Sequence, residues 1–110
     1  MKQIINRKVY DTETAEQIAN HGSMVDQGDF HALAETLYKD SSGEYFLHGQ
    51  GGAATRYAKQ TNDGTTYGEE IQVLTNEEAL DWSEERSINA DSIIEEFADL
   101  LGNTDSIPQN

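Results

Sequence analysis

The chain has 110 residues, 35% of them hydrophobic, which is enough for one modest core but not for two domains. It contains no cysteine, which excludes disulfides and thiolate metal sites. Its formal net charge of −14 opposes contact with nucleic acid or with an anionic membrane surface. No apolar run approaches the ~18 residues of a membrane span, and the first residues lack the apolar core of a signal peptide.

The negative charge is concentrated in one half of the chain. Residues 1–60 carry eight acidic and six basic side chains, a net charge of −2. Residues 61–110 carry thirteen acidic side chains and one basic side chain, Arg86, a net charge of −12. This asymmetry predicts a directed field that attracts a basic partner.

The first 30 residues predict a hairpin followed by a helix. Two short β-prone runs, 3–5 and 8–10, flank a two-residue turn that contains an asparagine. Asp11 or Thr12 then suits the N-cap of a short helix. The buried stripe of this helix would consist of Ala15, Ile18 and Ala19.

The middle of the chain predicts a second hairpin. Residues 30–38 have apolar positions that also fit a helical face, but the end of this run favours a strand. A turn at 40–43 and a strand at 44–48 complete the hairpin. We then expect a short helix over 53–59, a polar loop up to Gly68 and a strand over 70–74.

Two helices are predicted at the C-terminal end. Thr75 and Glu78 form a capping box, and Ala79 and Trp82 are expected to face inward. A last helix spans about 90–101, with Gly102 suited to follow its end and a polar tail over 103–110. Its apolar stripe comprises Ile93, Ile94, Phe97, Leu100 and Leu101. The predicted class is therefore α+β, with one domain over 1–102 and an antiparallel sheet made of two hairpins plus a strand.

Acidic residues recur at helical spacing in both C-terminal helices. Carboxylates four residues apart lie about 6 Å apart along a helix, so this spacing produces rows of charge. Like charges in such rows destabilise a helix slightly, and only Arg86 offers a nearby countercharge. The rows are interpreted either as a solvated helix face or as a surface that mimics a phosphate backbone.

Other groups of residues give only weak indications of a ligand, metal or catalytic site. The run of glycines at 49–52, followed by the predicted helix with Arg56 and Lys59, could hold a phosphate, but its spacing matches no nucleotide-binding motif. The three histidines lie in different elements without ligand spacing, and no serine has the context of a nucleophile. We therefore expect no enzymatic activity, no metal site and no cofactor. Trp82 is expected in the core, and Tyr67 is the better candidate for an exposed contact.

The chain resembles a family of small acidic proteins from phages, plasmids and other mobile elements of Gram-positive bacteria. The resemblance covers most of residues 3–100 and rests on the segments 9–15, 35–38, 43–52, 57–58 and 68–82. The family usually has Asn-Gly where this chain has Asn6-Arg7. The resemblance implies an anti-CRISPR inhibitor of a type II effector nuclease in the cytoplasm of the bacterial host, and it implies no catalytic residues.

The leading hypothesis is a non-enzymatic inhibitor that binds a basic nucleic-acid-binding effector through an acidic, DNA-mimicking surface, without binding nucleic acid or membrane itself. The expected contact residues are Glu77, Glu78, Asp81, Glu84, Glu85, Glu95, Glu96, Asp99 and Tyr67. One alternative is a small-ligand or regulatory binding module that uses the segment from Gly49 to Lys59. Another is an accessory protein of a mobile element that forms homodimers.

Overall fold

A computed structural model describes residues 1–24 and 28–101. The class is α+β, as predicted, with antiparallel strands and two α-helices. The strands are β1 (Lys2–Ile5), β2 (Lys8–Asp11), β3 (Glu16–Gly22), β4 (Leu33–Lys39), β5 (Tyr45–Gly51), β6 (Lys59–Thr61), β7 (Gly64–Thr66) and β8 (Gly68–Leu74). The helices are α1 (Asn76–Glu85), α2 (Ala90–Phe97) and the short 3-10 helix η1 (Ala98–Leu100).

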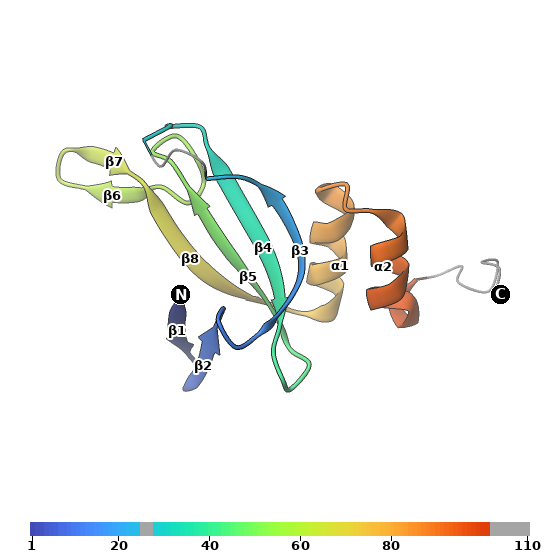
Figure 1. The fold of residues 1–110 in the computed structure, drawn as a ribbon. Coiled ribbons are helices and arrows are strands. Elements are labelled where there is room, and N and C mark those ends of the chain that lie inside the picture. The colour runs from blue at the N-terminus through green and yellow to red at the C-terminus, as the bar shows by residue number, and fades with distance from the viewer. Residues whose placement is uncertain (25–27, 102–110) are drawn as a thin grey trace.

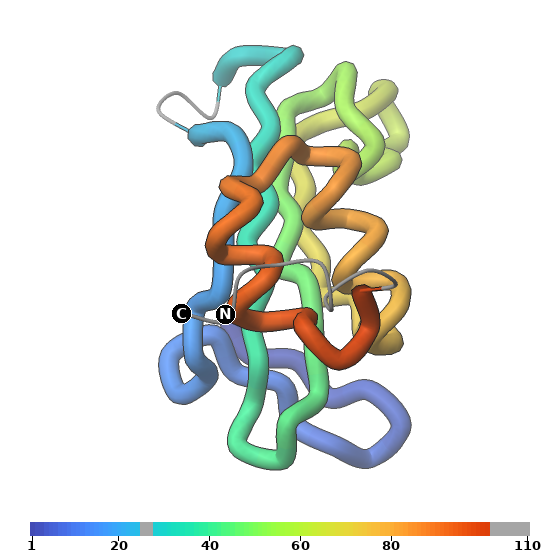
Figure 2. Tube along the Cα trace, turned by 90° about the vertical axis from the view of Figure 1, so that its right-hand side faces the viewer, coloured from blue at the N-terminus to red at the C-terminus, as the bar shows by residue number. Residues whose placement is uncertain are grey.

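The central sheet has four strands in the order β3-β4-β5-β8. Helices α1 and α2 cover one of its faces, and the hairpin β1–β2 lies on the other (Figure 1). The hairpin β6–β7 extends from the far end of the sheet (Figure 1). In the view turned by 90°, the helices lie in front of the sheet, and α2 lies beside the edge strand β3 (Figure 2).

Two clusters of buried side chains hold these layers together. The larger one lies between the sheet and the helices and is built around Leu37, Leu47, Trp82 and Phe97. The smaller one lies under the hairpin β1–β2 and contains Tyr10, Phe46 and Ile71. In that smaller cluster, the ring of Phe46 stacks on Tyr38 at 5.3 Å and meets the edge of Tyr10 at 5.4 Å.

Both predicted hairpins are present. Asn6 and Arg7 have φ angles of 52° and 69°, so the first turn has the left-handed residues of a type I′ turn without a glycine. The second hairpin joins β4 to β5 in unbroken register from Leu33↔Gly51 to Lys39↔Tyr45. The first hairpin, however, forms a separate two-stranded sheet, so the central sheet is not built from two hairpins plus a strand.

The predicted helix after Asp11 is wrong, because this segment forms β3. The Asp11 side chain accepts a hydrogen bond from the Glu13 backbone at 2.9 Å, so it caps a tight turn and not a helix. The pairing of β3 with β4 shifts register between Gln17 and Ala19. Because of this bulge, both Ile18 and Ala19 pack against the larger cluster between the sheet and the helices. The alternation of buried and exposed residues that marks a strand is therefore lost in the sequence at this point.

The predicted helix at 53–59 is also wrong. Two successive turns, closed by Thr55 N to Gly52 O at 3.0 Å and by Ala58 N to Thr55 O at 3.1 Å, lead into β6. The expected polar loop beyond it contains the hairpin β6–β7. The buried Tyr57 donates a hydrogen bond to Glu35 and its ring lies against Gly49, so tertiary contacts fix this segment and override the local helical pattern.

The C-terminal helices follow the prediction closely at their starts. Thr75 and Glu78 form the predicted capping box, and Asn89 caps α2. Ala79 and Trp82 are buried, as expected. The last helix ends earlier than predicted: α2 stops at Phe97 and the chain continues as η1. Gly102 and the tail over 103–110 lie outside the described residues.

Candidate functional site

Helix α1 presents a row of exposed carboxylates. Its buried residues fix one side of the helix against the core, so the residues between them face solvent. Glu77, Asp81, Glu84 and Glu85 are all exposed. Their spacing along the helix therefore places these acids on its solvent-facing side.

Helix α2 and η1 carry a second set of acids. Phe97 is buried, and its ring lies 5.3 Å from that of Tyr45 on β5. The exposed carboxylates on this side are Asp91, Glu95 and Asp99. We refer to the exposed acids of α1, α2 and η1, apart from the capping residue Glu78, as the acidic helical surface: Glu77, Asp81, Glu84, Glu85, Asp91, Glu95 and Asp99.

Two of the acids predicted to contact a partner form bonds within the fold. Glu96 turns toward the sheet, where its carboxylate lies 2.9 Å from the Lys39 ammonium and accepts a hydrogen bond from the Tyr45 hydroxyl. Burial and this hydrogen bond raise the pKa of Tyr45. Glu78 is exposed, but its Oε1 accepts the Thr75 backbone N–H at 2.8 Å. Both carboxylates therefore contribute bonds that hold the fold together.

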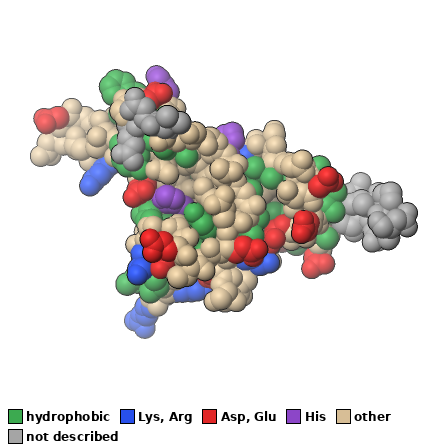
Figure 3. Space-filling model, viewed as in Figure 1, with side chains coloured by type: hydrophobic (Ala, Val, Ile, Leu, Met, Phe, Trp, Pro, Cys, Tyr) green, Lys and Arg blue, Asp and Glu red, His purple; other side chains and the backbone are tan. Residues whose placement is uncertain are grey.

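The acids of the acidic helical surface are not paired with basic side chains in the part of the chain that the structure describes. Arg86 follows α1, but its Nε donates to Glu35 Oε1 at 2.6 Å, on the side of the helix that faces the sheet. Figure 3 shows red acidic side chains gathered over the helical end of the molecule.

Glu35 is the centre of a buried polar network that the sequence pattern did not indicate. Its side chain is 0% exposed on β4, and it accepts hydrogen bonds from three residues. Arg86 and the Trp82 indole, at 3.2 Å, donate to Oε1, and the Tyr57 hydroxyl donates to Oε2. Arg56 adds a second positive charge 3.6 Å from Oε2.

This network determines the ionisation of its members. Burial acts to raise the pKa of Glu35, but the hydrogen bonds from Arg86, Tyr57 and Trp82 outweigh it, so the pKa is lower than usual. Burial and the bond to Glu35 raise the pKa of Tyr57. Glu35 is therefore a fully bonded anion that ties β4 to α1 and to the 52–58 turns, and has no free oxygen to offer a ligand.

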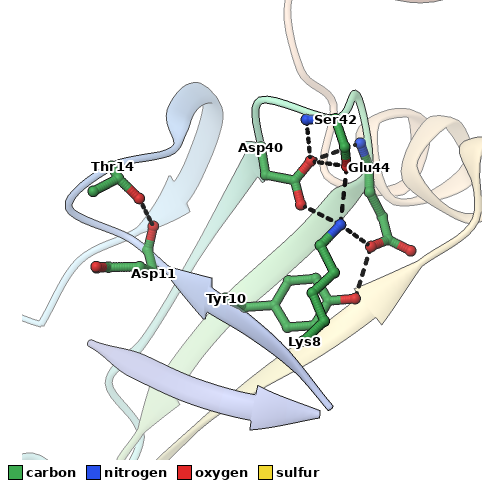
Figure 4. Close-up of polar contacts among 7 residues, drawn as sticks. All are labelled: Lys8, Tyr10, Asp11, Thr14, Asp40, Ser42 and Glu44. Carbon is green, nitrogen blue, oxygen red and sulfur yellow. Dashed lines mark hydrogen bonds and ion pairs between the residues drawn. The ribbon is translucent and has the colours of Figure 1, made fainter. Parts of the chain in front are cut away.

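A second polar cluster fastens the hairpin β1–β2 to the β4–β5 turn (Figure 4). Lys8 Nζ lies 2.8 Å from carboxylate oxygens of both Asp40 and Glu44, and it donates to Ser42 Oγ at 2.9 Å. Tyr10 donates to the same oxygen of Glu44 at 2.7 Å. Hydrogen bonds to Asp40 and Glu44 raise the pKa of Lys8. Burial acts to raise the pKa of Asp40, but the bonds from Lys8 and Ser42 lower it to about 2.

Tyr67 is half-buried on the sheet face opposite the helices. Its hydroxyl donates to Gln50 Oε1 at 2.6 Å and lies 3.5 Å from Glu69 Oε2. Glu69 in turn lies 3.1 Å from His48 Nε2. The structure thus places Tyr67 away from the acidic helical surface, although we expected it to contact a partner together with those acids.

The glycine-rich segment serves close packing. Without the predicted helix, no helix begins directly after Gly52, so this segment lacks the turn-helix geometry that the alternative with a phosphate site requires. A Cβ on Gly49 would lie 1.9 Å from Tyr57 Cζ, and one on Gly51 would lie 2.1 Å from Thr55 Oγ1. These glycines allow the 52–58 turns to lie on the sheet, which brings Tyr57 to Glu35.

Comparison with protein-family models, with curated proteins and with solved structures finds no match to this chain. No helix of the described part of the chain is both long enough and apolar enough to cross a membrane.

Proposed function

We propose that the protein is a non-enzymatic inhibitor that binds a basic nucleic-acid-binding effector through the acidic helical surface, in place of the effector's nucleic acid. One observation carries the proposal. The only basic side chain of residues 61–110, Arg86, bonds to the buried Glu35, and among the described residues no acid of the acidic helical surface forms an ion pair. Such a surface attracts positive charge and repels phosphate.

The geometry of the surface suits a nucleic-acid-binding groove. Carboxylates one helical turn apart follow α1, and a second helix carries further acids beside it. The helices are held on the sheet by a continuous core, so the charges are presented on a rigid support. The partner proposed from the family resemblance is a type II CRISPR effector nuclease, in the cytoplasm of a bacterial host.

The test is the salt dependence of binding to such a nuclease. We expect the dissociation constant to rise at least about tenfold between about 0.1 and 0.5 M salt, because the Debye length shortens over this range. A dissociation constant that stays flat across the range would rule out charge mimicry. If the protein does not bind the nuclease at any salt concentration, the proposed partner is wrong.

A further inference from the structure

The hairpin β1–β2 presents an apolar pair to solvent. Ile4 and Val9 lie directly opposite each other in the register, and they are 70% and 53% exposed. Tyr10, the next residue along β2, points the other way and is buried in the smaller cluster. The solvent face of an antiparallel sheet ordinarily carries polar side chains, so packing within the fold does not account for this exposed pair.

The turn of the same hairpin carries an arginine that the fold does not use. Arg7 has a φ angle of 69°, a left-handed conformation that glycine adopts freely and that other side chains adopt at a cost in free energy. Arg7 is exposed, and within residues 1–24 and 28–101 it forms no ion pair. Glycine at this position would make the same turn more readily, so the turn does not account for the arginine.

The hairpin is a basic region of an acidic protein. Residues 2–11 carry three basic side chains and one acidic side chain, a net charge of +2. Lys8 is bound in the cluster of Figure 4. The Lys2 side chain is 67% exposed, and its ammonium lies 3.8 Å from Asp11. Figure 3 shows blue basic and green hydrophobic side chains side by side over this hairpin, so its outer face combines positive charge with apolar surface.

The acidic helical surface has the complementary features. Its carboxylates are unpaired in the described part of the chain, and Leu100, which follows Asp99 on η1, is 36% exposed. At about 0.15 M salt the Debye length is about 8 Å, so the charges that meet at a contact between two copies outweigh the repulsion between their distant charges.

We propose that the outer face of the hairpin β1–β2 binds the acidic helical surface of a second copy of this chain. Ile4 and Val9 pack on the exposed apolar surface around Leu100, and Arg7 lies among the carboxylates of α2 and η1. The hairpin and the helices lie on opposite faces of the central sheet (Figure 1). The contact is therefore heterologous, and each copy can bind one neighbour through its hairpin and another through its helices. The inference does not depend on the proposed effector, although the contact covers acids that the proposed function assigns to effector binding.

Two variants test this geometry, each with one of the two surfaces removed. The hairpin variant changes three exposed residues: Ile4→Thr, Arg7→Gly and Val9→Thr. Threonine keeps strand propensity and glycine suits the left-handed turn, so this variant should fold. The helix variant removes three exposed charges from α2 and η1: Asp91→Asn, Glu95→Gln and Asp99→Asn. Circular dichroism checks that both are folded.

Sedimentation velocity then measures association. The hairpin face is small, so we expect weak binding, with the average mass of the wild type rising as its concentration approaches about 1 mM. Each variant alone should remain a monomer, while an equimolar mixture of the two should form pairs and nothing larger, because the mixture contains one intact copy of each surface. A wild type that stays monomeric, or a helix variant that associates with itself, would overturn the inference.

Nuclear magnetic resonance locates the contact and tests its specificity. Titration of the ¹⁵N-labelled helix variant with the unlabelled hairpin variant should shift the amide signals of Ile4, Arg7 and Val9. Poly-L-glutamate is the control, and equal shifts with it would show that the hairpin binds any polyanion and not a second copy of this chain.

A pair of single substitutions gives a test that does not rely on the triple variants. Arg7→Gly should weaken self-association at least about tenfold, because it removes a charge from the contact and suits the turn. Lys59→Gln removes the same charge from the other basic side chain that has no ion pair among the described residues, and should weaken it less than about twofold. Equal effects of the two substitutions would refute a contact at the hairpin.

Discussion

The Nε of Arg86 donates to Oε1 of Glu35 at 2.6 Å, across 51 residues of chain. The pair joins the only basic side chain of residues 61–110 to the only fully buried carboxylate among the described residues. It therefore has two effects: it neutralises a charge inside the fold, and it removes the countercharge from the acidic helical surface.

Replacing Arg86 with Met should destabilise the fold by roughly 3 kcal/mol, because Glu35 would keep its charge in a buried site with only the more distant Arg56 as a cation. Urea unfolding followed by circular dichroism measures the change. Glu84→Gln, an exposed change on the same helix, is the control and should leave stability within about 0.5 kcal/mol. A urea unfolding curve unchanged by Arg86→Met would show that the pair contributes nothing to the stability of the fold.

Trp82 is a core residue and a hydrogen-bond donor, and two substitutions separate these roles. Trp82→Ala should cost roughly 3–5 kcal/mol, the range for buried aromatic truncations. Trp82→Phe keeps most of the apolar volume but removes one donor to Glu35, and should cost roughly 1–3 kcal/mol. Thermal unfolding tests both. An Ala variant that melts like the wild type but no longer binds its partner would make Trp82 an interface residue instead.

Removal of three carboxylates from α1 should affect binding and not folding. The triple change of Glu77, Asp81 and Glu84 to Gln relieves like-charge repulsion of roughly 0.2–0.5 kcal/mol per pair, so stability should hold or rise slightly. Inhibition of the effector should fall.

The matched control for this variant removes the same amount of charge elsewhere, through Glu13→Gln, Asp63→Asn and Glu70→Gln. All three of these side chains are exposed and lie outside α1 and α2. If the two triple variants inhibit equally well, the acids of α1 act only through net charge and are not a binding surface.

The Lys8 cluster predicts a defined response to acid. The pKa of Asp40 is about 2 in the folded chain, below its ordinary value of 3.8. A depressed pKa stabilises the fold above 3.8, and this contribution is lost as the pH falls from there through about 2. The difference in unfolding free energy between the wild type and Asp40→Asn should therefore shrink over that window. A difference that stays constant from about pH 6 to about pH 2.5 would contradict this assignment.

Gly49 tests the role of the glycine-rich segment. Gly49→Ala places a methyl group against the Tyr57 ring and should cost roughly 1–3 kcal/mol in urea unfolding. Tyr57→Phe in the same background should then cost less than it does in the wild type, because the ring would already be displaced from Glu35. Strictly additive effects of the two changes would show that Gly49 and Tyr57 do not act together.

The α+β class, both hairpins, the strand before α1 and the capping box followed from local signals in the sequence. Turn residues, alternating apolar positions and the Thr75–Glu78 pair act over a few residues, so they can be interpreted without knowledge of the rest of the fold. The two wrong helices have a common cause. At Ile18 a bulge masks the strand period, and around Tyr57 contacts with distant residues replace the local preference.

The sequence by itself determined how much negative charge the protein carries and that α1 and α2 hold rows of acids at helical spacing. Only the tertiary structure decided which of these acids are free. Glu96 is bound to Lys39 and Tyr45, and Arg86 is bound to Glu35. Each of these contacts joins residues more than 50 positions apart, and pairing at that range is fixed by packing of the sheet against the helices and not by local spacing.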